Sequence, residues 1–470
     1  MAQDASGAGA AASRTTTLVI PGEMAARIDR LPASWVIFEI ALIVQLGWTT
    51  TGATDGIAAT LYPFIWLPHH AINHSQYSVL YAFQTGISIL LGGYFIGWLG
   101  DKIGRRKALI LSTLLAAIFI VPFGYVTNYP ALILLSIGDT LGFAGFLALN
   151  VTYTSEMAGP VARSRIIMFA QVFAIILGLS IWRGLIPHYM VPGQYKAYLW
   201  LLAGLNLVVM LLIIWRLPES PRWLEARGRT EQARTIVERL EARIRKRHPV
   251  LPEPDLKPYE VVSEEKTSMF AVFSKQYVFV TILLLVVMAL GYGGIVYGNG
   301  GYAYLFLAES RGYSASFVFA LTAWAGLAGG IAYLFNALVG DRVERKWTQL
   351  FGAIVFAGSW YGLYNVHNTP SVVVLFMLQE VGLVLWLWSM YVYIPANFPT
   401  RMRGLGTGWT DGIGHLGAWG GVLLCGAVFT AAAPLGWILL ITIPGALLPA
   451  AMVGTFGVRQ RRRVLEELAQ

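Results

Sequence analysis

The stretch Gly97-Trp98-Leu99-Gly100-Asp101-Lys102-Ile103-Gly104-Arg105-Arg106-Lys107 lies between two apolar runs and decides the fold. A degraded copy, Ala337-Leu338-Val339-Gly340-Asp341-Arg342-Val343-Glu344-Arg345-Lys346, lies between two other apolar runs about half the chain later. The repeat indicates that the chain consists of two related halves.

A second pair of polar sites keeps nearly the same offset. Glu156 and Arg163 follow the fourth apolar run, whereas Asn397 and Arg403 follow the tenth. Secondary transporters are built from repeated membrane halves with a binding site between them. The repeat therefore bears on function as well as on fold.

The composition excludes an ordinary soluble protein. Mean hydropathy is +0.60, and 56% of the residues are hydrophobic while only 13% are charged, where soluble domains carry about 25% charged residues. Runs of about 20 apolar residues are long enough to cross a bilayer, and there they must be helical. We predict twelve such helices, at about 35–62, 77–98, 108–128, 131–155, 165–187, 197–216, 276–298, 315–339, 348–366, 371–395, 405–430 and 435–457.

The basic residues predict the orientation. Of 34 Lys and Arg residues, only Arg183, Lys196 and Arg311 fall in or beside the loops and helix ends that we place outside. This bias predicts that both termini are cytoplasmic. We interpret the net charge of +9 as a signal that sets the orientation in the membrane and as an attraction to anionic lipid of the inner leaflet. Nucleic-acid binding is not indicated, because no basic cluster lies on a soluble domain. The single cysteine, Cys425, excludes a disulfide framework and a cysteine metal site.

The polar segments predict the domain organisation. The stretch after residue 217 contains an amphipathic helix, with Ala233, Ile236, Val237, Leu240 and Ile244 at helical spacing, followed by a proline-rich linker. The first 32 residues lack a short apolar core, so no cleavable signal peptide is evident. We predict a cytoplasmic arm, a six-helix bundle, a cytoplasmic linker with amphipathic helices, a second six-helix bundle and a cytoplasmic tail, at 1–32, 33–216, 217–274, 275–458 and 459–470.

At these residues the chain resembles the major facilitator superfamily, in its sugar-porter and organic-ion (metabolite:proton symporter) branch. The loop signature matches at Gly97, Asp101, Gly104, Arg105 and Arg106. Two further elements are similar to those after helices six and ten of the family: Pro218-Glu219-Ser220-Pro221-Arg222-Trp223-Leu224, and Tyr393 and Pro395 with Phe398-Pro399-Thr400 and Arg403-Gly404. The resemblance implies an all-α fold of twelve helices in two pseudo-symmetric bundles, alternating access and proton-driven uptake.

Departures from that pattern bear on the solute. Helix seven reads Gly291-Tyr292-Gly293-Gly294-Ile295-Val296-Tyr297-Gly298-Asn299-Gly300, where sugar porters tend to carry paired glutamines. His415 stands at a basic position of helix eleven, and the helix-four arginine is replaced near Asp139. These changes count against a sugar as the solute, and the presence of Arg183 favours an organic anion.

Ionisable residues inside membrane spans are costly and therefore suspected of function. A carboxylate in low dielectric has a raised pKa and can exchange a proton near neutral pH. Asp55, in a polar, glycine-containing part of helix one, is the favoured proton-coupling residue, although neighbouring hydroxyls could instead satisfy it as a structural residue. Beside it we place three further candidates, namely Glu380, Asp411 and His415.

The other candidates have open alternatives. Arg183 either meets an anionic solute or snorkels to the outer headgroups. Asp411 and His415 share one helix face and form either a proton relay or an interhelical hydrogen bond. Tyrosines around the glycines of helix seven line either the solute site or an external aromatic belt. The predicted solute-binding set is Asp55, Gln171, Arg183, Tyr292, Tyr297, Asn299, Gln379, Glu380, Trp386 and His415.

The loop signatures predict a cytoplasmic gate. By resemblance their charges hold the two halves together when the carrier faces outward, and the alternative is topology-setting charge alone. The predicted gate comprises Gly97, Asp101, Gly104, Arg105, Arg106, Glu156, Arg163, Glu219, Arg222, Asp341, Arg345 and Arg403.

We therefore predict a monomeric, multi-pass protein of a plasma or bacterial inner membrane that carries a small organic solute by proton symport. An organic anion or carboxylate, including an aromatic one, is favoured; a sugar or polyol, a cationic solute and a transporter-like sensor are the alternatives. We expect no enzyme activity, no cofactor beyond the proton gradient, no nucleic-acid partner and no metal, because His69, His70 and His74 in an outer loop lack nearby cysteines or acids.

Overall fold

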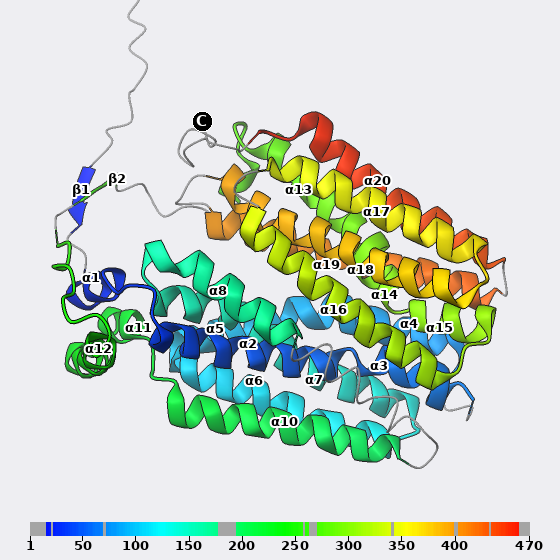
Figure 1. Cartoon of the computed structure of the whole chain (residues 1–470), viewed down its shortest axis with the longest axis horizontal. Coiled ribbons are helices and arrows are strands. Elements are labelled where there is room, and N and C mark those ends of the chain that lie inside the picture. Colours follow the sequence, from blue (N-terminus) through cyan, green and yellow to red (C-terminus); the bar gives the residue numbers. More distant parts are fainter. Residues whose placement is uncertain are drawn as a thin grey trace, which may run out of the picture.

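The computed structural model describes residues 16–19, 22–68, 72–176, 194–256, 259–262, 270–339, 343–398, 403–431 and 434–459. Long helices form two side-by-side bundles, the N-terminal one in blue to green and the C-terminal one in yellow-green to red (Figure 1). The halves meet along two seams, where α4 and η2 pack on α19 and where α8 packs on α16.

The N-terminal half forms six predicted spans. Their elements are α2 (Trp35–Asp55), α3 (Ile57–Leu61) and η1 (Tyr62–Trp66); α4 (His74–Ala82), η2 (Phe83–Ser88) and α5 (Ile89–Ile103); α6 (Arg105–Ile120) with η3 (Val121–Gly124); α7 (Tyr129–Met157); α8 (Pro160–Ile175); and α10 (Tyr195–Arg216).

The C-terminal half repeats this order. Its elements are α13 (Val278–Gly291), η6 (Tyr292–Val296), α14 (Tyr297–Gly300), α15 (Ala303–Leu305) and η7 (Phe306–Ser310); α16 (Ala315–Val339); α17 (Arg345–Asn365); α18 (Thr369–Tyr393) with η8 (Pro395–Asn397); α19 (Arg403–Thr430); and η9 (Leu435–Ile438) with α20 (Leu439–Phe456).

Eleven of the twelve predicted spans are confirmed as helices, and the described part of the fifth, up to residue 176, is helical as well. Ten helical segments within the described ranges are long and apolar enough to cross a membrane. The other two predicted spans, the fifth and the ninth, correspond to α8 and α17. Apolar side chains such as Tyr94, Trp200 and Trp215 are exposed on the outer surfaces of the bundles, as expected for helices that face lipid.

The two halves also repeat in atomic detail. Asn128 caps α7 by accepting a hydrogen bond from the Ala131 amide, and Asn368 caps α18 in the same way through the Ser371 amide. Each asparagine is followed two residues later by a proline in the first turn, where its missing N–H is harmless. The caps mark equivalent helix starts.

Equivalent cations cap the last turns of two outer helices, one in each half. Arg106, the second residue of α6, donates to the carbonyls of Ile213 and Ile214 at the end of α10. Lys346, the second residue of α17, donates to the carbonyls of Gly454 and Gly457 at the end of α20, at 3.1 and 3.4 Å. A cation suits the negative end of a helix dipole, so both halves use the same device.

The arm and linker form a separate layer at one end of the bundles, which we call the linker face. It holds α1 (Glu23–Asp29), α11 (Pro221–Ala226) and α12 (Thr230–Arg245), with η5 (Ala271–Phe273) leading into α13. Strands β1 (Thr16–Val19) and β2 (Tyr259–Val262) pair antiparallel beyond them (Figure 1). This small sheet was not predicted, since each strand is four residues long and lies in polar surroundings; the spanning part is all helical.

A buried carboxylate joins the arm to the linker. The Glu241 side chain is 1% exposed and pairs with Arg27 at 2.9 Å, Arg30 at 2.6 Å and Arg245 at 3.2 Å. Burial alone would raise the pKa of Glu241, but hydrogen bonds from Arg27 and Arg30 hold it below the ordinary value of 4.5. A lowered pKa in the folded state stabilises the docked arm above the ordinary value, and this contribution is lost as the pH falls below it.

We expect Glu241→Gln to release α1 from α12. Breaking a buried ion pair costs about 3 kcal/mol, so hydrogen exchange of the α1 amides should rise about 100-fold at pH 7. The same increase should appear in the wild type only below about pH 4.5. Glu238→Gln is the control, because Glu238 is an exposed residue of the same helix. Equal hydrogen exchange of the α1 amides in both variants would contradict the role of Glu241 in docking α1.

Three spans change helical register along their length. The π-helical segments η1, η2 and η6 interrupt the first, second and seventh spans. In η6, a Cβ on Gly293 would lie 2.8 Å from the Gly417 carbonyl oxygen, and one on Gly294 would lie 2.5 Å from the Gly445 Cα. Glycine thus lets the seventh span touch the eleventh and twelfth backbone to backbone, and π-bulges often mark functional positions.

Candidate functional site

Asp55 ends α2 in the interior of the N-terminal half. It is 8% exposed. Thr140 of α7 donates to its Oδ1 at 2.9 Å, and Gln84 of η2 donates to the same oxygen at 3.2 Å and to the Asp55 backbone carbonyl. The hydroxyls of Thr51 and Thr54 instead bond to carbonyls one turn back in α2. The partners of Asp55 therefore come from two neighbouring helices.

Asp139 lies beside Asp55 and is fully buried. The two carboxyl groups interact electrostatically, and Asp139 also lies beside Thr54 of α2, although neither of its oxygens makes a hydrogen bond of normal geometry within the described ranges. A buried polar group without partners is unfavourable when charged. Two acids from α2 and α7 thus share one buried region.

His415 occupies a tyrosine cage in the C-terminal half. Its ring centroid is 4.4 Å from that of Tyr292 and 5.7 Å from that of Tyr297. Its Nδ1 lies 2.9 Å from the Asp411 carbonyl oxygen, which can only accept, so Nδ1 carries a proton. The other nitrogen, Nε2, faces the Tyr297 hydroxyl at 3.5 Å. A second proton on His415 would therefore sit on Nε2.

Asp411 extends this cage. The Tyr292 hydroxyl donates to its Oδ1 at 2.5 Å and lies 2.8 Å from the hydroxyl of Tyr391. The predicted pairing of Asp411 with His415 on one face is present, but it runs through the backbone carbonyl of Asp411 rather than its carboxylate. The arrangement connects η6, α18 and α19.

The two clusters face each other across the seam between the halves. Tyr297 interacts electrostatically with both Asp55 and Asp411. On η2, Gln84 bonds Asp55, while a Cβ on Gly86 would lie 3.2 Å from the His415 carbonyl oxygen. The π-helical turn of the second span thus contacts both clusters, and acidic, aromatic and imidazole groups converge near the middle of the spans.

The halves close together at the face opposite the linker, where α4 begins. The Tyr77 hydroxyl donates to the Gly301 carbonyl at 2.9 Å, and the Tyr302 hydroxyl donates to Ser78 at 2.7 Å. A Cβ on Gly426 of α19 would lie 1.8 Å from the Ser78 Oγ. Tyr302 is 1% exposed, so it belongs to this closure and not to an external aromatic belt.

His74 also belongs to this closure. Its Nδ1 lies 2.5 Å from the Tyr62 hydroxyl, and its Nε2 lies 3.8 Å from Glu309 across the seam. No group of three or more potential metal ligands occurs in the part of the chain that the structure describes. Two of the three outer-loop histidines, His69 and His70, lie outside the described residues.

Other predicted solute ligands are not brought to this centre. Glu380 lies against Gly329 of α16, and Gln379 donates to it at 3.4 Å. The Trp386 ring packs on Gly291, within the core of the C-terminal half. Gln171 is buried in α8. Arg183 and the side chain of Asn299 lie outside the described residues.

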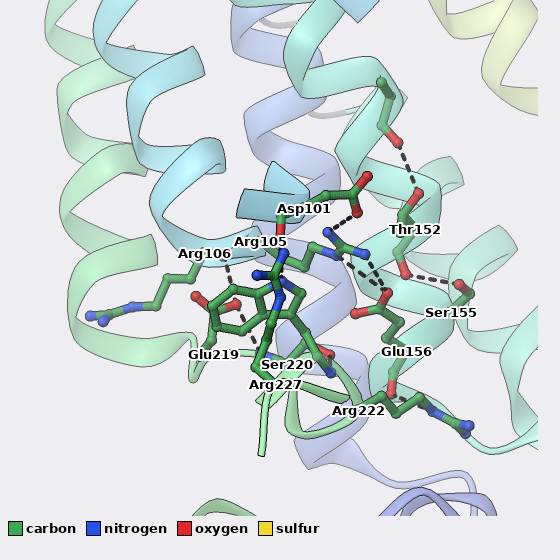
Figure 2. A network of polar contacts seen from close by, with 12 residues as sticks. Asp101, Arg105, Arg106, Thr152, Ser155, Glu156, Glu219, Ser220, Arg222 and Arg227 are labelled. Carbon is green, nitrogen blue, oxygen red and sulfur yellow. Dashed lines mark hydrogen bonds and ion pairs between the residues drawn. The ribbon is translucent and has the colours of Figure 1, made fainter. Parts of the chain in front are cut away.

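The predicted gate forms a charge network at the linker face (Figure 2). Arg105 pairs with Asp101 and, at 3.3 Å, with Glu156. Arg222 of α11 pairs with Asp29 at 2.5 Å and donates to the Glu156 carbonyl at 3.2 Å. These contacts join helices of the N-terminal half to the arm and linker.

Glu219 caps the start of α6. Its Oε1 accepts from the amides of Arg106 and Ser220, at 3.1 and 3.0 Å. Burial raises the pKa of Glu219, which these amide hydrogen bonds oppose. Gly104, at φ 110°, permits the approach, because a Cβ there would lie 2.2 Å from the Glu219 Oε2. The glycine of the loop signature is thus required by geometry, whereas Gly97 faces only ordinary contacts.

The rest of the predicted gate is less defined. Asp341 and the side chains of Arg163 and Arg403 lie outside the described residues, and Arg345 begins α17. The role of the network in holding the halves together stays a prediction.

Sequence reasoning missed four contributors to the centre: Gln84, Thr140, Tyr391 and the glycine pair Gly293 and Gly417. Gln84 is a long amide in the second apolar run, which could have marked it. Thr140 and Tyr391 are unremarkable in sequence and gain meaning only when the helices are packed.

Comparison with known proteins agrees with this architecture. The niacin transporter NiaP of Acinetobacter baylyi is 25% identical over 410 residues, covering 84% of this chain and 88% of that protein. The 4-hydroxybenzoate transporter PcaK of the same organism is 28% identical over 357 residues, covering 72% and 76%. The proton:xylose symporter XylE bound to 6-bromo-6-deoxy-D-glucose has the same fold, with a TM-score of 0.64 and 20% identity over 93% of this chain and 99% of that one.

The family model described as the Major Facilitator Superfamily matches residues 40–418, most of the chain. Its members are transporters and not enzymes, and the many spanning helices agree with a multi-pass protein of the cell membrane. Two repeated bundles with a polar centre between them, together with this match, show that the chain belongs to the Major Facilitator Superfamily.

Proposed function

We propose that this protein carries a small aromatic carboxylate together with a proton by alternating access. The observation that carries the proposal is the facing pair of clusters at the seam: Asp55 with Thr140 in one half, and His415 in its tyrosine cage in the other.

The C-terminal cluster suits an aromatic acid. The rings of Tyr292 and Tyr297 provide surfaces for stacking. When His415 carries a second proton, its Nε2–H is free to donate to a carboxylate because Nδ1 already bonds the Asp411 carbonyl. Among the described side chains near the middle of the spans, His415 alone can carry a positive charge.

The N-terminal cluster suits a proton. An ionised carboxylate in low dielectric is unfavourable unless it is paired, and a solute carboxylate nearby would repel it. Protonation of Asp55 removes both penalties, so proton and anion would bind together. Thr140 and Gln84 can donate to the ionised form after the proton leaves, which would allow release on the other side.

Relatives favour this solute class. Niacin and 4-hydroxybenzoate, carried by the two relatives named above, are both aromatic carboxylic acids. A sugar or polyol is the alternative within transport, and a sensor that binds without transport is the alternative of another class.

Purified protein in liposomes provides the test. Vesicles with an acidic exterior would be offered labelled nicotinate, 4-hydroxybenzoate, xylose and choline, with an internal pH dye. Accumulation of an aromatic acid with matching proton entry supports the proposal. Accumulation of xylose favours the sugar alternative, and saturable binding without uptake of any solute favours the sensor.

We expect His415→Gln to weaken uptake of the aromatic acid. A hydrogen bond to a charged group contributes about 1.5–3 kcal/mol, so kcat/KM should fall about 10- to 100-fold with the acid. His367→Gln is the control. It removes a histidine that contacts Arg311 at the face opposite the linker, away from the tyrosine cage, and should leave uptake unchanged. Equal kcat/KM for both variants would contradict the assignment.

A further inference from the structure

A pocket of about 590 Å³ opens on the linker face, away from the central site. It is bounded by the start of α6, the end of α10, and the linker helices α11 and α12. The charge network of Figure 2 forms one wall, through Arg106 and Glu219. The solute pathway proposed above makes no use of this pocket.

The pocket is strongly cationic. Its lining includes six basic residues and one acid, Glu219; the basic residues are Arg106, Lys107, Arg216, Arg229, Arg239 and Arg243. Glu219 is already engaged by two backbone amides. The excess of positive charge therefore calls for an anionic occupant.

Three of these cations make neither an ion pair nor a side-chain hydrogen bond with any described residue. Arg216 and Arg243 both pair with Glu39, and the Arg106 side chain caps α10. Lys107, Arg229 and Arg239 are exposed and make no ion pair with any described residue. They converge on the pocket from α6, the α11–α12 turn and α12.

The pocket also lies at the level of the membrane surface. Trp215, in the last turn of α10, is 73% exposed and lines the pocket, and tryptophan favours the membrane–water interface. Apolar side chains of Ile214 and Ile236 line it beside the cations. Cations next to apolar surface at this depth suit an amphiphile better than a free ion.

We propose that this pocket binds the phosphate-bearing headgroup of an anionic phospholipid, with the acyl chains lying along α10 beside Trp215. The phosphate takes the place of the missing acid for Lys107, Arg229 and Arg239. The lipid would thereby anchor α12 to the membrane surface and to the N-terminal half.

Native mass spectrometry of the purified full chain with added phosphatidylglycerol tests the proposal. Each Lys or Arg contributes about 1 kcal/mol near an anionic surface, so the triple variant Lys107→Gln, Arg229→Gln, Arg239→Gln should bind about 100-fold more weakly. The control variant Lys246→Gln, Arg247→Gln, Lys275→Gln removes the same charge from exposed residues outside the pocket. It should bind as the wild type does; equal weakening in both variants would overturn the site.

Two further measurements use the wild type alone. A photoreactive phosphatidylglycerol should label peptides that contain Lys107, Trp215 and Arg239, and labelling confined to other helices would overturn the proposal. Glycerol phosphate at millimolar concentration should fail to displace the lipid, whereas full displacement would assign the pocket to a soluble phosphate instead.

Discussion

Liposomes that contain Asp55→Asn protein are expected to exchange solute across the membrane without accumulating it. One pH unit corresponds to a tenfold ratio, so a gradient of two units supports about 100-fold accumulation for one coupled proton. The variant should reach a ratio of about 1, because asparagine keeps the contacts to Thr140 and Gln84 but cannot release a proton. Accumulation is measured under the gradient and exchange by counterflow at equal pH.

Asp139→Asn is the matched comparison. Asp139 is buried beside Asp55 and makes no hydrogen bond of normal geometry within the described ranges. Such a carboxyl group is most stable when it keeps its proton, so a neutral amide of the same shape should preserve accumulation. Full accumulation by Asp55→Asn together with loss in Asp139→Asn would transfer the coupling role to Asp139.

Gly426→Leu is expected to stop transport by preventing closure at the face opposite the linker. A Cβ there would lie 1.8 Å from the Ser78 Oγ and 2.5 Å from the Tyr302 hydroxyl oxygen. Ser78 belongs to the other half, whereas Tyr302 belongs to the same half as Gly426. The leucine side chain should therefore push against Ser78 and hold the two halves apart. Solute uptake should fall more than tenfold, since a carrier that cannot close one face cannot complete its cycle.

Gly420→Leu serves as its control on the same helix. No atom lies within 4 Å of a Cβ at that position, so this variant should transport normally. Thermal unfolding in detergent would verify that both variants are folded. Uptake by Gly426→Leu at the wild-type rate would show that this closure is not part of the cycle.

The spans could be predicted from sequence because lipid imposes a simple rule. A run of about 20 apolar residues must be a helix, and the run lengths alone located the helices. The π-helical turns could not be found this way, since η2 and η6 depend on how Gly86 and Gly293 meet other backbones. The paired caps at Asn128 and Asn368 were readable in sequence, as an asparagine followed two residues later by proline at equivalent places.

The centre of the site was predictable only in part. Asp55 could be recognised as a candidate because burying a charged side chain in a membrane span costs free energy. Its partner Thr140 could not be, because a threonine in an apolar helix has many structural uses and the pairing depends on helix rotation. Glu380 was conspicuous for the same reason as Asp55, yet it packs against Gly329 of α16, the helix that meets α8 at the second seam.

The contacts described above attach the linker helices to the arm and to the N-terminal half, and none of these contacts reaches the C-terminal half. Glu219, Arg222 and Glu241 tie them to the arm and to helices of the N-terminal half. If the halves rock, α12 would move together with the N-terminal half and change its distance from the C-terminal half. Spin labels on α12 and α17 would then read the rocking angle directly, and the one native cysteine, Cys425, is buried and leaves such labelling undisturbed.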